Sequence, residues 1–282
     1  MTQISQAAIT EFATTVTNKY SDSRKLAEAV ESVTGATGAQ YKFPVLSSSM
    51  AKARVGFGED LVPNADAFGT VTATATDWYS TDYIESFEQM KVNFSLSENF
   101  SNRMAKAIGR RADQVIIDAL IAAKADITNE VATDISGVVS NLTLDALIEA
   151  AGLLNDNGVD EEDRFFVCSS QGLRGLLKDD KLTSSDYAAV QALVNGTVDS
   201  FMGFKFITIA AGRGEGGLDL TTNVRTNYAF HKDAIGYVEF GAMDMTGAFS
   251  ASKGVDVITA KLSAAAAVKD ATGVVRVLSS EA

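Results

Sequence analysis

Residues that carry much of protein chemistry are scarce in this chain of 282 residues, which has one histidine, His231, and one cysteine, Cys168. One cysteine forms no intrachain disulfide, so the fold does not depend on an oxidising compartment. The common zinc sites, built from several His and Cys side chains, cannot be assembled. A serine or cysteine nucleophile would have to recruit His231, and no G-x-S-x-G elbow occurs. We therefore expect neither an enzyme nor a metal or cofactor site.

Basic residues are also few, because 24 Lys and Arg stand against 36 Asp and Glu, a formal net charge of −12. Tight binding to nucleic acid needs clustered cations that displace counterions from phosphates, and no such cluster interleaved with aromatic residues occurs. Tight nucleic-acid binding and docking on an anionic membrane are therefore disfavoured, whereas loose or repulsive contact with nucleic acid stays open.

Long hydrophobic runs are missing too. No stretch approaches 18 uninterrupted apolar residues, so no membrane span is expected. The N-terminus lacks the basic start and the apolar core of a signal peptide. Hydrophobic residues nevertheless make up 46% of the chain, which is enough for a substantial core. We expect a globular protein made and kept in a reducing cytoplasm.

Glycine is plentiful, and one glycine loop resembles a nucleotide-binding motif. Gly212, Gly214 and Gly217 in "ITIAAGRGEGG" fit the dinucleotide pattern G-x-G-x-x-G. That motif needs a strand, the glycines and a helix whose N-terminus faces the pyrophosphate. After Gly217 the chain reads "LDLTTNVRTNYAF", which has a strand signal and no helical periodicity. A glycine-rich surface loop is the simpler interpretation, and a nucleotide-dependent oxidoreductase remains an alternative.

A long amphipathic helix is predicted at about residues 95–125, where Ser95 and Glu98 have the spacing of a capping box. Apolar residues recur there at helical intervals: Leu96, Phe100, Met104, Ile108, Val115 and Leu120. At about 1.5 Å per residue such a helix is a rod on the order of 45 Å. It is much longer than the usual three-turn helix.

The residues before this helix indicate an arm and an extended hairpin. Helical spacing of Leu26, Val30 and Val33 predicts a short amphipathic helix before Gly35 and Gly38 break the pattern, and we expect this lead-in to lie outside the core. Residues 40–92 are rich in β-branched and aromatic residues, which favour strands running out and back. An isolated hairpin is only marginally stable, so neighbouring subunits are expected to hold it.

The rest of the chain alternates between helix and strand. "LTLDALIEAAGLLNDNG" predicts a helix, "DRFFVCSS" a buried strand and "QGLRGLLKDD" a short helix. Strand patterns then follow in "SFMGFKFITIAA", "TNYAFHKDAIGYVEF", "GVDVITAKLSA" and "TGVVRVLS". No internal repeat is visible. The fold class is α+β.

This order of elements resembles the Hong Kong 97-type major capsid protein of tailed bacteriophages, especially short-tailed phages. The local matches are "YKFPVL", "SFMGFKFITI", "AFHKDAIGYVEF" and the terminal "VDVITAKLSAAAAVKDATGVVRV". The resemblance implies an α+β capsid fold with five parts. These are an N-terminal arm (1–38), an extended loop (39–78), a peripheral domain (79–140) with a spine helix at about 95–125, an axial domain (141–250), and return strands of the peripheral domain (251–282).

The resemblance also implies a function, which is self-assembly of pentamers and hexamers into an icosahedral shell around double-stranded DNA, without sequence-specific binding. Scaffolding, portal and decoration proteins are the implied partners. The protein would be assembled in the host cytoplasm, would end in the virion and would need no cofactor. An encapsulin-type nanocompartment shell shares this fold and is the main alternative.

Contacts between subunits are expected in the extended loop. Charged residues would line the rim of the interface and set its register: Lys52, Arg54, Glu59 and Asp60. Apolar residues would be its anchors: Phe43, Val55, Phe57 and Leu61.

Overall fold

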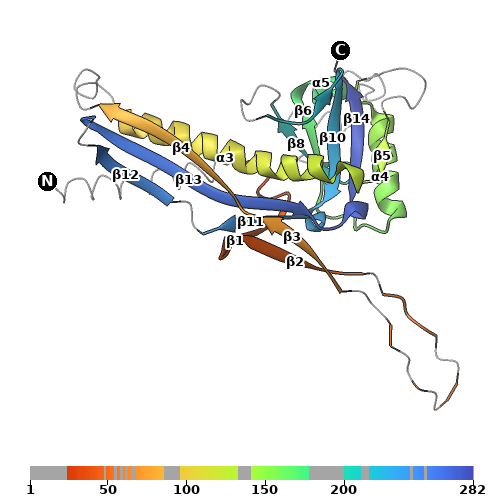
Figure 1. Cartoon of the computed structure of the whole chain (residues 1–282). Helices are drawn as coiled ribbons and strands as arrows, with labels where there is room; N and C mark the ends of the chain where they lie inside the picture. Colours follow the sequence, from red (N-terminus) through yellow and green to blue (C-terminus); the bar gives the residue numbers. More distant parts are fainter. Residues whose placement is uncertain are drawn as a thin grey trace.

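The computed structural model has an α+β fold in which a long helix and a long sheet lie beside a compact unit, with one hairpin extending away from both (Figure 1). The structure describes these residues: 24–47, 49–53, 56–57, 60, 63–64, 68–85, 96–132, 141–177, 200–210, 216–241, 244–250 and 253–281.

The predicted long helix is present as α3 (Leu96–Ala122), continued by the 3₁₀ turn η1 (Ala123–Ala125). Its apolar residues recur on one face, and Met104, Ile108 and Leu120 are almost completely buried. The helix exists because this stripe packs against the long sheet, since most helical stability in proteins comes from such packing. The capping residue proposed at Ser95 lies outside the described residues.

The long sheet is built around β13. Within the described residues its strands are β1 (Glu31–Ala36), β4 (Thr76–Glu85), β11 (Ile235–Phe240), β12 (Asp244–Ser250) and β13 (Val255–Val268). The first half of β13 pairs with β4 on one edge and β12 on the other, and its second half pairs with β11. Alternate β13 residues such as Ile258, Ala260 and Leu262 face the helix, as the two-residue period of a strand requires.

The compact unit is a second sheet with helices against it. Its described strands are β5 (Glu130–Val131), β6 (Arg164–Ser169), β7 (Ser200–Phe201), β8 (Phe204–Ile209), β9 (Leu220–Thr221), β10 (Val224–His231) and β14 (Val274–Ser280). The helices of this unit are α4 (Leu144–Asp156) and α5 (Ser170–Leu177), and the short turns η2 (Lys232–Ala234) and η3 (Ala271–Gly273) follow β10 and β13.

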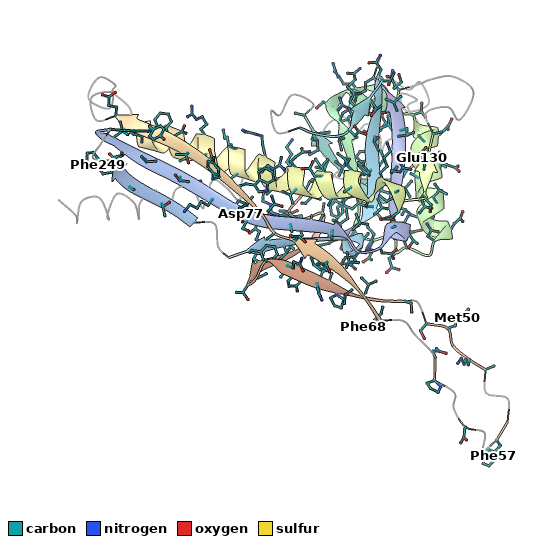
Figure 2. The ribbon with its side chains drawn as sticks, in the orientation of Figure 1. Met50, Phe57, Phe68, Asp77, Glu130 and Phe249 are labelled. Atoms are coloured by element: carbon teal, nitrogen blue, oxygen red, sulfur yellow. The ribbon has the colours of Figure 1, made fainter. Side chains whose placement is uncertain are left out.

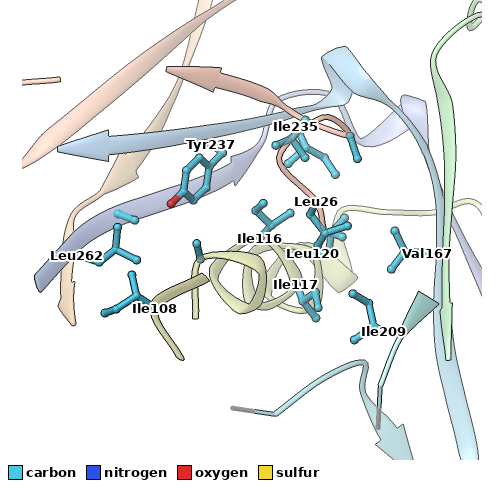
Figure 3. Close-up of a cluster of buried hydrophobic side chains, with 14 of the residues drawn as sticks. Leu26, Ile108, Ile116, Ile117, Leu120, Val167, Ile209, Ile235, Tyr237 and Leu262 are labelled. Carbon is cyan, nitrogen blue, oxygen red and sulfur yellow. The ribbon is translucent and has the colours of Figure 1, made fainter. Parts of the chain in front are cut away.

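Strand β6 shows why "FFVC", at residues 165–168, is a continuous apolar run. Phe165 and Val167 belong to the core that packs against α3, whereas Phe166 and Cys168 belong to the core under α4 and α5. A strand buried on both faces has no polar side, so it does not alternate. The α3 core joins side chains from both sheets and the helix (Figure 3). The two sheets therefore share one hydrophobic cluster.

One expectation is wrong for the residues just before β1. Leu26, Ala29 and Val30 are buried in the α3 core, and β1 pairs in parallel with β11. Asp113 of α3, itself fully buried, accepts hydrogen bonds from the backbone N–H groups of residues 25 and 26 at 3.1–3.2 Å. These residues form turns and a strand of the body, not a helix of an arm.

The strands divide between the two sheets differently from the boundaries expected for the domains. Strands β11 and β12 lie in the long sheet, although the compact unit was expected to extend to residue 250. Strand β14 lies in the compact sheet, although residues 251–282 were expected to return together. The chain crosses between the units at η2 and η3, which contact each other, so a division by sequence alone does not separate them.

The glycine loop lacks the context of a nucleotide site. Gly212 and Gly214 lie outside the described residues, and Gly217 has φ +132. The next described elements are the strands β9 and β10, with no helix between Gly217 and β10. The dinucleotide fingerprint requires that helix, so the interpretation as a surface loop is supported by the elements that follow.

Candidate assembly surfaces

The most protruding feature is the hairpin of β2 (Gln40–Leu46) and β3 (Phe68–Thr74), which extends away from both sheets (Figure 1). The two strands pair antiparallel without a break in register, from Gln40 opposite Thr74 to Leu46 opposite Phe68. In the described residues β2 pairs with no other strand. Such a ribbon needs further contacts to be stable.

The root of the hairpin provides one such contact. Phe43 is 2% exposed and packs with Ala73, Val238 and Ala265. Tyr41 meets the Phe43 ring edge to face, with the ring centroids 4.9 Å apart. Phe43, expected to anchor a neighbouring subunit, therefore lies inside its own chain and has little surface left for a partner.

The loop beyond the strands is tied together by polar contacts. Lys52 Nζ donates a hydrogen bond to the carbonyl oxygen of Pro63 at 3.1 Å. The side-chain amide of Asn64 donates to Ser49 Oγ and to the carbonyl oxygen of Met50, both at 2.7 Å. Each contact joins the outgoing limb to the returning limb. Lys52, whose charge was expected to face a neighbouring subunit, thus also joins the two limbs of its own loop.

Large apolar side chains point away from the protein along this hairpin. Phe57 is fully exposed, Met50 is 75% exposed, and Leu46 and Phe68 are each 68% exposed (Figure 2). Single exposed apolar residues are normal, but a run of them on one protruding element marks an interaction surface. The hairpin is therefore the candidate assembly site of the described chain.

The predicted contact residues divide into three groups. Lys52, Phe57 and Asp60 lie in the loop and are exposed, and Phe43 lies at its buried root. Four other residues lie outside the described residues: Arg54, Val55, Glu59 and Leu61. Sequence reasoning missed Leu46, Met50 and Phe68. The adjacent apolar residues "VL" before the loop could have indicated that Leu46 is exposed, because neighbouring strand residues face opposite sides.

A second exposed surface lies on the face of the long sheet that is turned away from α3. Tyr79 and Tyr83 of β4 are exposed there. Thr81, which lies between the two tyrosines on β4, shares a hydrogen bond with Thr259 of β13 at 3.0 Å. The alternate β4 residues face the helix, where the Arg111 guanidinium lies 3.5 Å from the centroid of the Trp78 ring. This contact fixes β4 on the helix and leaves the tyrosines outward.

Cys168 and His231, the residues best suited to nucleophilic or acid–base chemistry, have structural roles here. Cys168 is fully buried, and burial raises the pKa of its thiol to about 12, so the reactive thiolate is not formed near neutral pH. His231 Nδ1 accepts a hydrogen bond from the N–H of Asp233 at 3.2 Å and caps η2. Among the described residues, no group of three His, Cys, Asp or Glu side chains is placed to hold a metal.

None of the described helices combines the length and the apolar composition that crossing a membrane requires.

Comparison with known proteins gives the family. A sequence model of the phage capsid protein family matches residues 4–281, almost the whole chain. The chain belongs to the phage capsid protein family. No curated protein matches its sequence. The chain is a structural protein of the capsid and a virion component, because the family is one of capsid proteins and not of enzymes.

Solved structures from phages and of a virus-like particle share the fold at low sequence identity. The capsid of cyanophage P-SCSP1u has a TM-score of 0.70 at 16% identity, covering 92% of this chain and 89% of that one. Mycobacterium phage Che8 has a TM-score of 0.65 at 20% identity, covering 86% and 85%. The virus-like particle from Pyrococcus furiosus has a TM-score of 0.63 at 8% identity, covering 95% and 98%. The predicted Hong Kong 97-type fold is confirmed.

Proposed function

We propose that this capsid protein forms the pentamers and hexamers of an icosahedral shell around double-stranded DNA, and that its loop lies across the adjacent subunit. The observation that carries the proposal is the hairpin, which is fixed at a buried root and carries exposed Leu46 and Phe68 where its strands end and exposed Phe57 further out in the loop. Burying these exposed apolar side chains in a partner gains transfer free energy, less the cost of ordering them.

The expected interface combines apolar anchors with charged residues at its rim. Fully burying a Leu, Met or Phe side chain contributes about 1.5–3 kcal/mol, so Met50, Phe57 and Phe68 together supply a useful fraction of the binding energy. Lys52 and Asp60 are the described charges beside them, and Arg54, Val55, Glu59 and Leu61 are proposed to extend the same surface. Obligate interfaces of this kind bury roughly 2,000–5,000 Å².

Several further roles belong to this proposal. The net charge of −12 disfavours tight adhesion of DNA to the shell, so packaged DNA would be enclosed without sequence-specific contacts. Scaffolding, portal and decoration proteins are the proposed partners, and assembly is proposed to occur in the host cytoplasm. The compact unit would be the axial domain around each capsomer, and the long sheet with α3 the peripheral domain.

A nanocompartment shell built on the same fold, the alternative named from the sequence, is less well supported. The match of residues 4–281 to a phage capsid family favours the phage shell. Neighbouring genes distinguish the two, because a phage shell requires portal and packaging genes and a nanocompartment requires an enzyme as cargo. A cargo enzyme beside this gene, with no portal gene, would favour the nanocompartment.

The position of the loop can be tested by photocrosslinking within assembled shells. With p-azidophenylalanine in place of Phe57, irradiation should join subunits into covalent dimers and higher multimers, because the exposed ring would lie on a neighbour. The matched control carries p-azidophenylalanine in place of Tyr41, at the partly buried root of the same hairpin. It should give few covalent multimers. Equal yields at both positions would show that the loop does not reach a neighbour.

A further inference from the structure

The contact between the hairpin and the body depends on a glycine. A Cβ atom built on Gly236 of β11 would lie 2.6–2.8 Å from Cζ, Cε1 and Cε2 of Phe43. Carbon atoms in contact prefer separations of about 3.5–4.0 Å. The end of the Phe43 ring therefore occupies the space that any other side chain at Gly236 would need.

The ring has little room to move aside, since it is 2% exposed and is enclosed by neighbours on several elements. Ala73 of β3, Val238 of β11 and Ala265 of β13 surround it. Lys269 Nζ lies 6.0 Å from the ring centroid and forms an ion pair with Glu31 of β1. Besides its own strand β2, residues of three other strands, β3, β11 and β13, thus pack with this one side chain.

The hairpin is also joined to the body by packing of β3 against β13 and by the single residue, Ala75, between β3 and β4. In the described residues β2 and β3 form a sheet of their own, and no backbone ladder joins them to the long sheet. At the base, the N–H of Ala75 donates to the carbonyl oxygen of Ala39 at 3.0 Å and joins the two limbs to each other. Because no ladder fixes it, side-chain packing contributes to the angle between hairpin and body, and Phe43 is the one aromatic member of the fully buried cluster at this contact.

We propose that the seating of Phe43 on Gly236 sets the direction in which the loop leaves the body. It thereby determines where the loop lands on the adjacent subunit and how sharply the shell curves. Phe43 and Gly236 are positioning residues, since neither is exposed to the partner. This inference rests on the proposed function of the loop, but the direction of the loop itself can be measured without assembly.

The pair offers a complementary substitution. Gly236→Ala adds one carbon atom where the ring stands, and a displacement of about 1 Å at the root is needed to restore normal contact. Phe43→Leu removes the three ring atoms that would collide with that carbon. The double variant Phe43→Leu/Gly236→Ala therefore nearly conserves volume, the kind of exchange that cores tolerate best.

The test measures the distance between spin labels on the hairpin and on the body in unassembled, full-length subunits. Cysteines replace exposed Leu46, at the end of β2, and exposed Ile148, on α4. The native Cys168 is fully buried and stays unlabelled, because burial raises the pKa of its thiol to about 12. Pulsed electron paramagnetic resonance should give one narrow distance distribution for the otherwise native chain.

Gly236→Ala should shift or broaden that distribution, and Phe43→Leu/Gly236→Ala should return it toward the native one. Gly69→Ala is the matched control on the same hairpin, because its added carbon would lie 3.6 Å from the nearest atom, an ordinary contact. An unchanged distribution in Gly236→Ala, or a broad one in the native chain, would overturn the proposal. If Gly236→Ala fails to fold, Phe43→Leu alone must broaden the distribution, and an unchanged one would equally overturn it.

Shell assembly of the same variants separates this inference from the proposed function. Gly236→Ala is expected to give shells of irregular or several diameters, and the double variant a single diameter again. Regular shells from a variant whose hairpin has moved would show that the direction of the loop does not govern curvature. Regular shells from a loop variant such as Phe57→Asp would instead remove the loop from assembly, while the distance measurement would still decide whether Phe43 and Gly236 fix its direction.

Discussion

Phe57→Asp is expected to prevent shell formation while leaving the subunit folded and soluble. Phe57 is fully exposed in the isolated chain, so its replacement should change the free energy of unfolding by less than about 0.5 kcal/mol. In the interface the carboxylate would replace an apolar anchor, at a cost of about 2–4 kcal/mol per contact, or about 30- to 700-fold in the contact's equilibrium constant. The loss recurs at every subunit, so closed shells should disappear from electron micrographs.

Phe57→Leu is the control for this change, because it keeps an apolar side chain and should still give shells at reduced yield. Reactivity of the Cys168 thiol verifies folding, since the thiol is fully buried and should stay unreactive in both variants. Normal shells from Phe57→Asp would show that this part of the loop is not an assembly contact. A reactive thiol in Phe57→Asp would show instead that the variant is unfolded. That result would contradict the expectation that replacing an exposed side chain leaves the fold intact.

Glu281→Ala is expected to destabilise the compact unit by about 3–5 kcal/mol. Arg225 and Glu281 form an ion pair at 2.7 Å with side chains only 8% and 5% exposed. Ser169 Oγ donates a hydrogen bond to the same carboxylate, and Arg225 NH1 donates to the carbonyl oxygen of Leu218 at 2.7 Å. Removing the carboxylate leaves a buried guanidinium without its counter-charge, and a buried unpaired charge is far costlier than a lost surface contact.

Urea unfolding of unassembled subunits measures this cost. Lys205→Ala is the matched control, because it breaks the Lys205–Asp163 ion pair of the same unit at 2.8 Å, where both side chains are about half exposed. That variant should lose less than about 1 kcal/mol. If Glu281→Ala costs no more than Lys205→Ala, the buried ion pair does not hold the end of the chain on the compact unit.

The long helix shows what the sequence alone could predict. Its hydrogen bonds and its apolar period are local, so the expected range of about 95–125 agrees with α3 and η1. Strand β6 was predicted for a similar reason, because a short apolar run bounded by polar turns is typical of a buried strand. The absence of a helix between Gly217 and β10 was also predicted, because helical periodicity is a local pattern.

Phe43 shows what local patterns could not reveal. Its aromatic character predicted an anchor, but whether it anchors a neighbour or its own chain depends on Gly236, which is far away in the sequence. The same limit applies to the residues before β1. The spacing of Leu26, Val30 and Val33 fits a helix, yet the partner strand β11 and the acceptor Asp113 determine the structure. Three apolar positions do not distinguish these outcomes.

The buried pair of Arg225 and Glu281 was not anticipated at all. Charged residues are usually exposed, and no local pattern marks one that is buried by a distant partner. The exposed apolar residues of the hairpin were predicted in part, because Phe57 was named as a contact, whereas Leu46 and Phe68 were not. What a residue faces in a multi-subunit shell is set by the partner, and one chain does not contain that information.

The central claim, that this capsid protein builds shells from copies of itself, is tested most directly by electron microscopy of the purified full-length protein, alone and with a candidate scaffolding protein. We expect closed shells or sheets of hexamers in which each loop lies on an adjacent subunit. Small oligomers of uniform size under all conditions, with or without the scaffolding protein, would contradict the account.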